Sequence, residues 1–235
     1  MREITLGNRL LSVAELVRGG AVFADVGTDH AYLPLFLLKN GKIERAICSD
    51  INVGPLENAR ANAEEYGLTD KISFVLTDGA VALSGLGITD MAICGMGGEL
   101  IADIIEAAPF IKNERVHLIL QPMTKQEHLR TYLLKNGFEI TGEVYSAEGK
   151  RSYITLEAEY TGTATPISCE RILGCAVYKC AEEQLAYLTS KLNSMKRELM
   201  GKRASGEDTA VLGEQVLYTQ NLVNNLKKYI KEKEK

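Results

Sequence analysis

Two carboxylates and an imidazole surround a single glycine at the end of a short apolar run. Residues 21–30 are AVFADVGTDH, so Asp25, Asp29 and His30 all lie within three positions of Gly27. A dinucleotide-binding loop would have Gly-x-Gly-x-x-Gly here, and a P-loop would have Gly-Lys-Ser/Thr. Neither pattern is present, and a carboxylate at Asp29 would repel phosphate in a site without metal. The stretch therefore predicts a ligand that is cationic or neutral at this point.

Two further aspartates end the next two apolar runs, Asp50 in RAICSD and Asp78 in ISFVLTD. S-adenosylmethionine suits such acids, because it has a sulfonium, an ammonium group and a ribose but no phosphate. Asp25 and Asp29 would face its positive methionine end. Asp50 would accept hydrogen bonds from the ribose hydroxyls, and Asp78 would accept one from the adenine amino group. The alternative is that each aspartate caps the following helix, which is strained for three successive strand ends together.

Strand-like and helix-like segments alternate through the first part of the chain. An opening helix over 4–17 precedes strands expected at 21–26, 45–50, 72–78, 91–98 and 116–122. The helices between and after them are expected at 31–41, 52–67, 97–108 and 125–137, and a β-hairpin at 138–160. This alternation predicts an α/β fold, a parallel sheet with helices on both faces. Such a sheet binds ligands at the carboxyl ends of its strands, where the acids lie.

The pattern changes after residue 162. Apolar residues step by three and four over 181–199 and again over 212–230, separated by the polar break GKRASGED. Two heptad segments joined by a short loop predict an antiparallel helical hairpin of coiled-coil type. We therefore expect one domain over 1–162 and a second over 163–235. The hairpin would serve dimerisation, the gripping of a substrate, or simple capping of the fold.

Charge is unevenly distributed between the two expected domains. The chain carries −4 overall, with −7 over residues 1–160 and +3 over 161–235. The basic end points to an anionic partner such as nucleic acid, or is only a solvated helix end. No apolar run approaches the ~20 residues needed to cross a bilayer, and the first residues do not resemble a signal peptide. Five cysteines without a CxxC pair predict reduced thiols, no metal and a cytoplasmic location.

Four motifs together carry a family resemblance: ADVGTDHAYLP (24–34), SDINVGPLENARANA (49–63), TDGA (77–80) and AICGMGGELI (92–101). They resemble class I S-adenosylmethionine-dependent methyltransferases and, more narrowly, the bacterial tRNA (adenine-N1)-methyltransferase family that modifies adenosine 22. The resemblance covers most of the chain, including the C-terminal hairpin. It implies a seven-stranded Rossmann-like sheet, S-adenosylmethionine as methyl donor and tRNA as substrate, with the hairpin as the tRNA-binding domain. It leaves the oligomeric state open.

The resemblance places the cofactor across Gly27, Asp29, Asp50 and Asp78. Many methyltransferases carry three alternate glycines after the first strand, whereas this chain has Gly27, Asp29 and Ala31, which fits the narrower family. The full set of expected cofactor-binding residues is Asp25, Gly27, Thr28, Asp29, Asp50, Ile51, Asp78, Gly79 and Gly95.

The fourth strand indicates the kind of nucleophile. Exocyclic-amine methyltransferases commonly have an (Asn/Asp)-Pro-Pro-aromatic turn here, but residues 94–98 are CGMGG. The hypothesis is that adenine N1 attacks with its own lone pair, aligned by backbone carbonyls near Gly95 and Met96. Asp29 would stabilise the positively charged product. His30 would either relay a proton or cap the next helix.

Adenine N1 lies on the base-pairing edge, so the target base must leave any helix before it reacts. Met96 or Tyr32 would stack on that base. The competing interpretation is loop packing for Met96 and an ordinary core position for Tyr32, which is favoured for Tyr32. Gln121, at the end of the fifth strand, is expected to contact the base through its amide. Arg9, Lys150 and Arg151 are candidates for phosphate contacts or are merely solvated.

Two other functions fit these residues less well. One keeps S-adenosylmethionine but replaces tRNA by another RNA, a protein or a small molecule. The other is a methyltransferase fold that no longer catalyses and serves as an RNA-binding module. The basic hairpin argues against the first, and the intact acids and glycine loops argue against the second.

Overall fold

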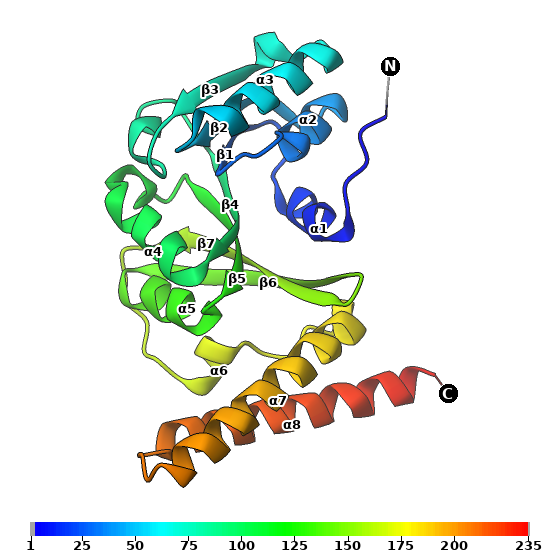
Figure 1. Ribbon diagram of the computed structural model, residues 1–235, viewed down its shortest axis with the longest axis vertical. Helices are drawn as coiled ribbons and strands as arrows, with labels where there is room; N and C mark the ends of the chain where they lie inside the picture. Colours follow the sequence, from blue (N-terminus) through cyan, green and yellow to red (C-terminus); the bar gives the residue numbers. More distant parts are fainter. Residues whose placement is uncertain (1–2, 235) are drawn as a thin grey trace. The chain divides into compact units, whose positions relative to one another are not determined.

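The computed structural model describes residues 3–234, which form two compact units (Figure 1). The first consists of residues up to 143 together with 155–165, and the second of 144–154 with the residues from 166 onward. The structure thus groups 144–154, the tip of the β-hairpin, with the C-terminal helices, whereas the sequence-based boundary lies between 162 and 163.

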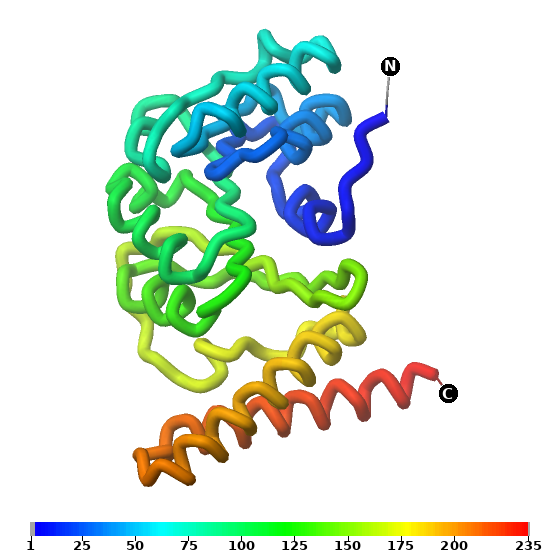
Figure 2. Tube along the Cα trace, viewed as in Figure 1, coloured from blue at the N-terminus to red at the C-terminus, as the bar shows by residue number. Residues whose placement is uncertain are grey.

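The sheet has seven strands in the order β3-β2-β1-β4-β5-β7-β6. The strands are β1 (Ala21–Val26), β2 (Ile43–Asp50), β3 (Ile72–Leu76), β4 (Asp90–Gly97), β5 (His117–Thr124), β6 (Phe138–Glu148) and β7 (Arg151–Tyr160). Strands β1 to β5 pair in parallel, and β7 runs antiparallel to β5. Figure 2 shows the chain leaving β1 towards β2 and returning to place β4 on the other side of β1. The expected seven-stranded Rossmann-like sheet is confirmed.

The helices of the first unit are α1 (Asn8–Leu16), α2 (Tyr32–Lys39), α3 (Val53–Tyr66), α4 (Gly98–Ala107) and α5 (Gln126–Lys135). Single 3-10 turns lie at Thr69–Lys71, Val81–Leu83 and Pro109–Ile111. The first helix is shorter than expected, since residues 4–7 are not helical. Ile4 and Leu6 pack against the core from an extended segment. Their spacing from the apolar residues of α1 resembles that of a helix, which is why the sequence predicted a longer one.

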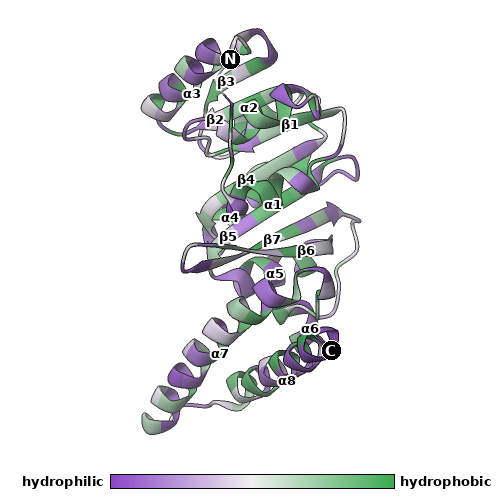
Figure 3. Ribbon diagram, turned by 90° about the vertical axis from the view of Figure 1, so that its right-hand side faces the viewer, coloured by the Kyte–Doolittle hydropathy of each residue, from purple (hydrophilic) through white to green (hydrophobic). Residues whose placement is uncertain are grey.

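Both faces of the sheet are covered. Side chains alternate between the faces of a strand, and Phe23, Cys48 and Ala92 join one core cluster with residues of α1, α2 and α3. Ile47 and Ile93, which adjoin Cys48 and Ala92 along their strands, are equally buried on the opposite face. Figure 3 accordingly shows β1 and β4 as largely hydrophobic. Apolar residues on both faces explain the continuous apolar runs of the sequence.

The second unit is built on two long helices, α7 (Ala181–Ala204) and α8 (Ala210–Lys233), preceded by α6 (Cys169–Leu173) and a turn at Tyr178–Cys180. Leu188 and Leu192 of α7 pack with Leu226 of α8. The helices run antiparallel, because the rings of Tyr178 and Tyr229 lie 4.4 Å apart at one end. Further along, Lys196 Nζ donates to Gln220 Oε1 at 2.6 Å, closer to the loop that joins the helices.

The hairpin tip packs within this second unit. The ring of Tyr145 lies 5.2 Å from that of Tyr187 on α7, and the Tyr145 amide donates to Cys180 Sγ at 3.4 Å. None of the helices within residues 3–234 has the length and apolar character that crossing a membrane requires.

Candidate active site

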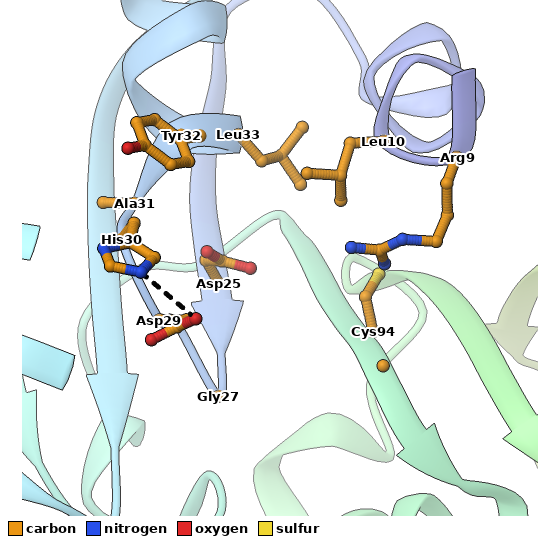
Figure 4. A pocket seen from close by; sticks show the side chains of 11 residues that line it. Arg9, Leu10, Asp25, Gly27, Asp29, His30, Ala31, Tyr32, Leu33 and Cys94 are labelled. Carbon is orange, nitrogen blue, oxygen red and sulfur yellow. Dashed lines mark ion pairs between the residues drawn. The ribbon is translucent and has the colours of Figure 1, made fainter. Parts of the chain in front are cut away.

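A pocket of about 350 Å³ lies at the carboxyl edge of the sheet, where the chain order reverses between β1 and β4 (Figure 4). In open α/β sheets this reversal is where ligands bind, because the connections on its two sides leave in opposite directions. The lining comes from α1, from the end of β1 and the segment after it, from the start of α2 and from β4. It comprises Arg9, Leu10, Asp25, Gly27, Asp29, His30, Ala31, Tyr32, Leu33, Cys94 and Gly95.

The segment after β1 is held in one conformation by its backbone. The amides of Gly27 and Thr28 donate to the Ser49 carbonyl at 2.8 and 2.9 Å, which ties the turn to β2. Gly27 has φ +78°, a conformation that side chains disfavour, and a Cβ there would overlap the methyl group of Met96. Gly27 therefore both forms the turn and leaves room for Met96, which packs against it.

Asp25 is the buried acid of the pocket. The Thr28 hydroxyl donates to its Oδ2 at 2.6 Å. Burial raises the pKa of Asp25 to about 6, and Asp50 contributes to the rise, while the Thr28 hydrogen bond and the charge of Arg9 oppose it. A carboxylate that has lost most of its hydration is strongly stabilised by a bound cation. Asp25 is thus suited to a positively charged ligand.

Arg9 reaches the pocket from α1, on the side opposite His30 and Tyr32 (Figure 4). Its Nη1 donates to Gln121 Oε1 at 2.8 Å, while Gln121 Nε2 donates to the Arg9 carbonyl and to Thr155 Oγ1. Gln121 is fully buried and does not line the pocket, so the structure does not bring its amide to the place expected for the base. Gln121 instead holds a guanidinium that the sequence did not assign to the cofactor.

Asp29 and His30 lie at the mouth of the pocket. His30 Nε2 and Asp29 Oδ2 are 3.4 Å apart, with the two side chains 43% and 76% exposed (Figure 4). The residue at the start of α2 is Ala31, in the left-handed region with φ 55°, and within residues 3–234 no side-chain hydrogen bond caps this end of the helix. The helix-cap alternative for His30 is therefore wrong.

Tyr32 is not the core residue that its sequence context favoured. It begins α2, is 45% exposed and lines the pocket. The apolar sequence YLPLFLL gives no indication of this, because only the three-dimensional start of the helix turns Tyr32 away from the core that Leu33 and Leu35 enter.

Asp50 and Asp78 lie at the same edge of the sheet but outside the lining of the pocket. Asp50 ends β2, and its Oδ1 accepts a hydrogen bond from the Asn52 amide at 2.8 Å, just before α3. Asp78 is exposed two residues after β3, and Ile51 is 61% exposed beside Asp50. Gly79, with φ +59°, packs against Ile104, where a Cβ would come within 3.1 Å. The edge thus continues from the pocket as an open acidic and apolar surface.

The comparisons with known proteins agree with this geometry. A family model described as a methyltransferase domain matches residues 6–156. The tRNA (adenine(22)-N(1))-methyltransferase of Bacillus subtilis is 39% identical over 159 residues, which cover 68% of this chain and 67% of that protein. The crystal structure of the B. subtilis m1A22 tRNA methyltransferase TrmK has a TM-score of 0.75 at 32% identity, over 96% of this chain and 99% of that one. Streptococcus pneumoniae Sp1610, solved in complex with S-adenosyl-L-methionine, has a TM-score of 0.78 at 29% identity, over 93% and 100%.

Proposed function

The chain belongs to the methyltransferase domain family and, within it, to the tRNA (adenine(22)-N(1))-methyltransferases, and we propose that it methylates N1 of adenosine 22 in tRNA. The methyl donor is S-adenosylmethionine, and the reaction takes place in the cytoplasm. The observation that supports the proposal most strongly is the pocket at the β1–β4 reversal, where a buried carboxylate faces a guanidinium.

The residues at the carboxyl edge fit the donor group by group. The methionine end of S-adenosylmethionine carries a carboxylate, an ammonium and a sulfonium. Arg9 supplies the positive charge for the first of these, and Asp25 supplies a buried negative charge for the other two. Asp50 would bind the ribose hydroxyls and Asp78 the adenine amino group, next to the exposed apolar surface of Ile51. Gly27, Thr28, Gly79 and Gly95 would contribute backbone contacts.

S-adenosylmethionine supplies an electrophilic methyl group, so the protein's task is to align a nucleophile with it. Adenine N1 has an available lone pair and needs no strong base before attack. The methylated ring is positive, and Asp29 stabilises it as an exposed carboxylate at the pocket mouth. Burial raises the pKa of the Cys94 thiol well above its usual value, so Cys94 is not a competing methyl acceptor.

The tRNA would be gripped by the basic helices of the second unit. Lys227 and Lys231 lie one turn apart on α8 and are both exposed. A Lys227→Glu/Lys231→Glu variant should bind tRNA at least tenfold more weakly and show a shallower salt dependence, because two phosphate contacts are lost. The matched variant Glu232→Gln should bind at least as well as the wild type. Unchanged tRNA affinity in the Lys227→Glu/Lys231→Glu variant would contradict tRNA binding by this face of α8 and leave the helices with a structural role.

The enzymatic proposal is tested by incubating the protein with S-adenosylmethionine and unmodified tRNA transcripts, then digesting the RNA for mass spectrometry of nucleosides. We expect 1-methyladenosine from a transcript with adenosine 22 and none from the same transcript with guanosine 22. Methylation of both transcripts would contradict the position, and no methylated nucleoside despite cofactor binding would contradict tRNA as the substrate.

A further inference from the structure

Two aromatic rings form a stacked pair at the mouth of the pocket. The rings of His30 and Tyr32 lie 5.4 Å apart between centroids, with their planes 27° from parallel. Both residues line the pocket, and both are close to half exposed. In Figure 4 the two rings lie one above the other, next to Asp29 and across the pocket from Arg9.

The backbone between the two rings has a defined conformation. Ala31 lies between the two rings in the left-handed region, with φ 55°, which a residue with a side chain adopts only when its surroundings fix it. Asn62 of α3 donates its side-chain amide to the His30 carbonyl at 2.9 Å, and the Leu35 amide donates to the Ala31 carbonyl at 2.9 Å. These contacts hold the backbone that carries the two rings in one conformation, which places both rings at the pocket.

Tyr32 contributes little to the core. Helix α2 buries all four of its leucines, Leu33, Leu35, Leu37 and Leu38, whereas Tyr32 leaves 45% of its surface exposed. A large ring kept at a pocket mouth is suited to contact a planar partner, since aromatic rings pack favourably in offset-stacked or edge-to-face arrangements. The bases of RNA that leave a helix are bound in this way, by stacking on aromatic side chains.

We propose that the His30–Tyr32 pair is the platform on which the target adenine stacks after it leaves the tRNA helix. This inference rests on the proposed function and assigns the residue that positions the substrate base. The platform adjoins Asp29, the carboxylate assigned to the positively charged product. Asp50 and Asp78, the acids assigned to the adenosine part of the cofactor, lie outside the lining of the pocket. Tyr32 shares that lining with Asp25 and Asp29, so a base on Tyr32 would lie beside the acids assigned to the methionine end of the donor.

The test compares two substitutions of one residue. Tyr32→Leu keeps apolar bulk without a ring, and Tyr32→Phe keeps the ring without the hydroxyl. We expect Tyr32→Leu to lower kcat/KM for tRNA methylation about tenfold or more, the loss typical of removing a base-stacking ring. Tyr32→Phe should stay within about threefold of the wild type. Both variants should bind S-adenosylmethionine within about twofold of the wild type, as measured by calorimetry.

Fluorescence of the base gives a second, independent measurement. A tRNA with 2-aminopurine at position 22 should be quenched more strongly by the wild type and by Tyr32→Phe than by Tyr32→Leu. Equal activity and equal quenching for all three proteins would overturn the platform while leaving the methyltransferase intact. A parallel loss of cofactor affinity in Tyr32→Leu would also overturn it, because Tyr32 would then be a cofactor contact. No methylation by the wild type would remove the proposed function and this inference together.

Discussion

The two edges of the sheet shift the pKa of a buried aspartate in opposite directions. At the amino edge of the sheet, Asp90 begins β4, and its pKa is lowered to about 2. At the carboxyl edge, Asp25 lies near the end of β1, and its pKa is raised to about 6. Both side chains are buried, so burial alone does not explain the difference. The partners that surround each carboxylate decide it.

Asp90 is surrounded by donors. Its carboxylate accepts hydrogen bonds from the Arg18 amide at 2.9 Å, from the Arg18 guanidinium at 3.0 Å and from His117 Nδ1 at 3.3 Å. Burial would raise the pKa of Asp90, but the bonds from His117 and Arg18 outweigh it. His117 is in turn 3.2 Å from Glu157 on β7 through its Nε2. The amino edge is thus a network that ties β4, β5 and β7 together.

The buried polar groups of the carboxyl edge have fewer hydrogen-bond partners than Asp90 has. Asp25 has one hydrogen bond from Thr28, and Ala31 is held in a left-handed conformation. The Ser49 hydroxyl, one residue before the end of β2, is buried without a hydrogen-bond partner among residues 3–234. Such features weaken a fold and are tolerated where a ligand uses them. The amino edge therefore stabilises the sheet, and the carboxyl edge is prepared for binding.

The removal of Asp90 is expected to lower the stability of the protein more than any other change considered below. Asp90→Ala leaves the half-exposed Arg18 guanidinium and the buried His117 without their shared carboxylate, and the loss of such hydrogen bonds to a charged group typically costs about 3 kcal/mol. We expect the free energy of unfolding in urea to fall by that amount. Affinity of the remaining folded protein for S-adenosylmethionine should stay unchanged, and a drop there would show that the two edges are not independent.

The opposite effect is expected from Asp25→Asn. A carboxyl whose folded pKa is about 6 instead of 3.8 favours unfolding as the pH rises through this interval, because the unfolded chain releases its proton first. At pH 7 the cost is about 3 kcal/mol, so the neutral variant should unfold with a free energy higher by up to that amount. The same variant should lose most of its affinity for S-adenosylmethionine. A variant both destabilised and fully able to bind would contradict the assignment of Asp25.

A smaller loss of stability is expected when acid protonates Asp90 at the amino edge. The pKa of Asp90 is lower in the folded chain than in the unfolded one, so its contribution of about 2 kcal/mol is present above pH 4 and is lost as the pH falls towards 2. Asp90→Asn should therefore flatten the decline in unfolding free energy between pH 4 and pH 2. Parallel declines in the wild type and the variant would show that another group governs acid unfolding.

The smallest change is expected at Ser49. Ser49→Ala removes a buried hydroxyl that lacks a hydrogen-bond partner in the described chain, and this should leave the free energy of unfolding unchanged or raise it by about 1 kcal/mol. Thermal unfolding of the variant beside the conservative Ser49→Thr measures the difference. A clear loss of stability in Ser49→Ala would reveal a hydrogen bond of this hydroxyl in solution.

The sequence predicted the architecture and the position of aspartates at the carboxyl edge of the sheet, because both follow from local patterns. Apolar runs ending in Asp25, Asp50 and close to Asp78 mark strand ends, and parallel strands bring these ends to one edge. Contacts between distant positions could not be predicted in the same way. Arg9 meets Gln121 across 112 residues, and Arg18 meets Asp90 across 72.

Tyr32 shows a different reason for a wrong prediction. Its neighbours in YLPLFLL are almost all apolar, so no periodicity separates an exposed position from a buried one. The left-handed Ala31 decides which way the first turn of α2 faces, and a left-handed alanine has no signature in one sequence. The sequence named Tyr32 as a candidate for stacking on the base, but only the structure shows that it is exposed at the pocket and not part of the core.

The most direct test of the account is the affinity for S-adenosylmethionine as a function of pH, measured by calorimetry between pH 5 and pH 7. If the ionised Asp25 carboxylate faces the positive end of the cofactor, affinity should fall about tenfold from pH 7 to pH 5. In Asp25→Asn, the residual affinity should be independent of pH over this range. Equal affinity of the wild type at pH 5 and pH 7 would contradict the claim that the buried acid of the carboxyl edge binds the methyl donor.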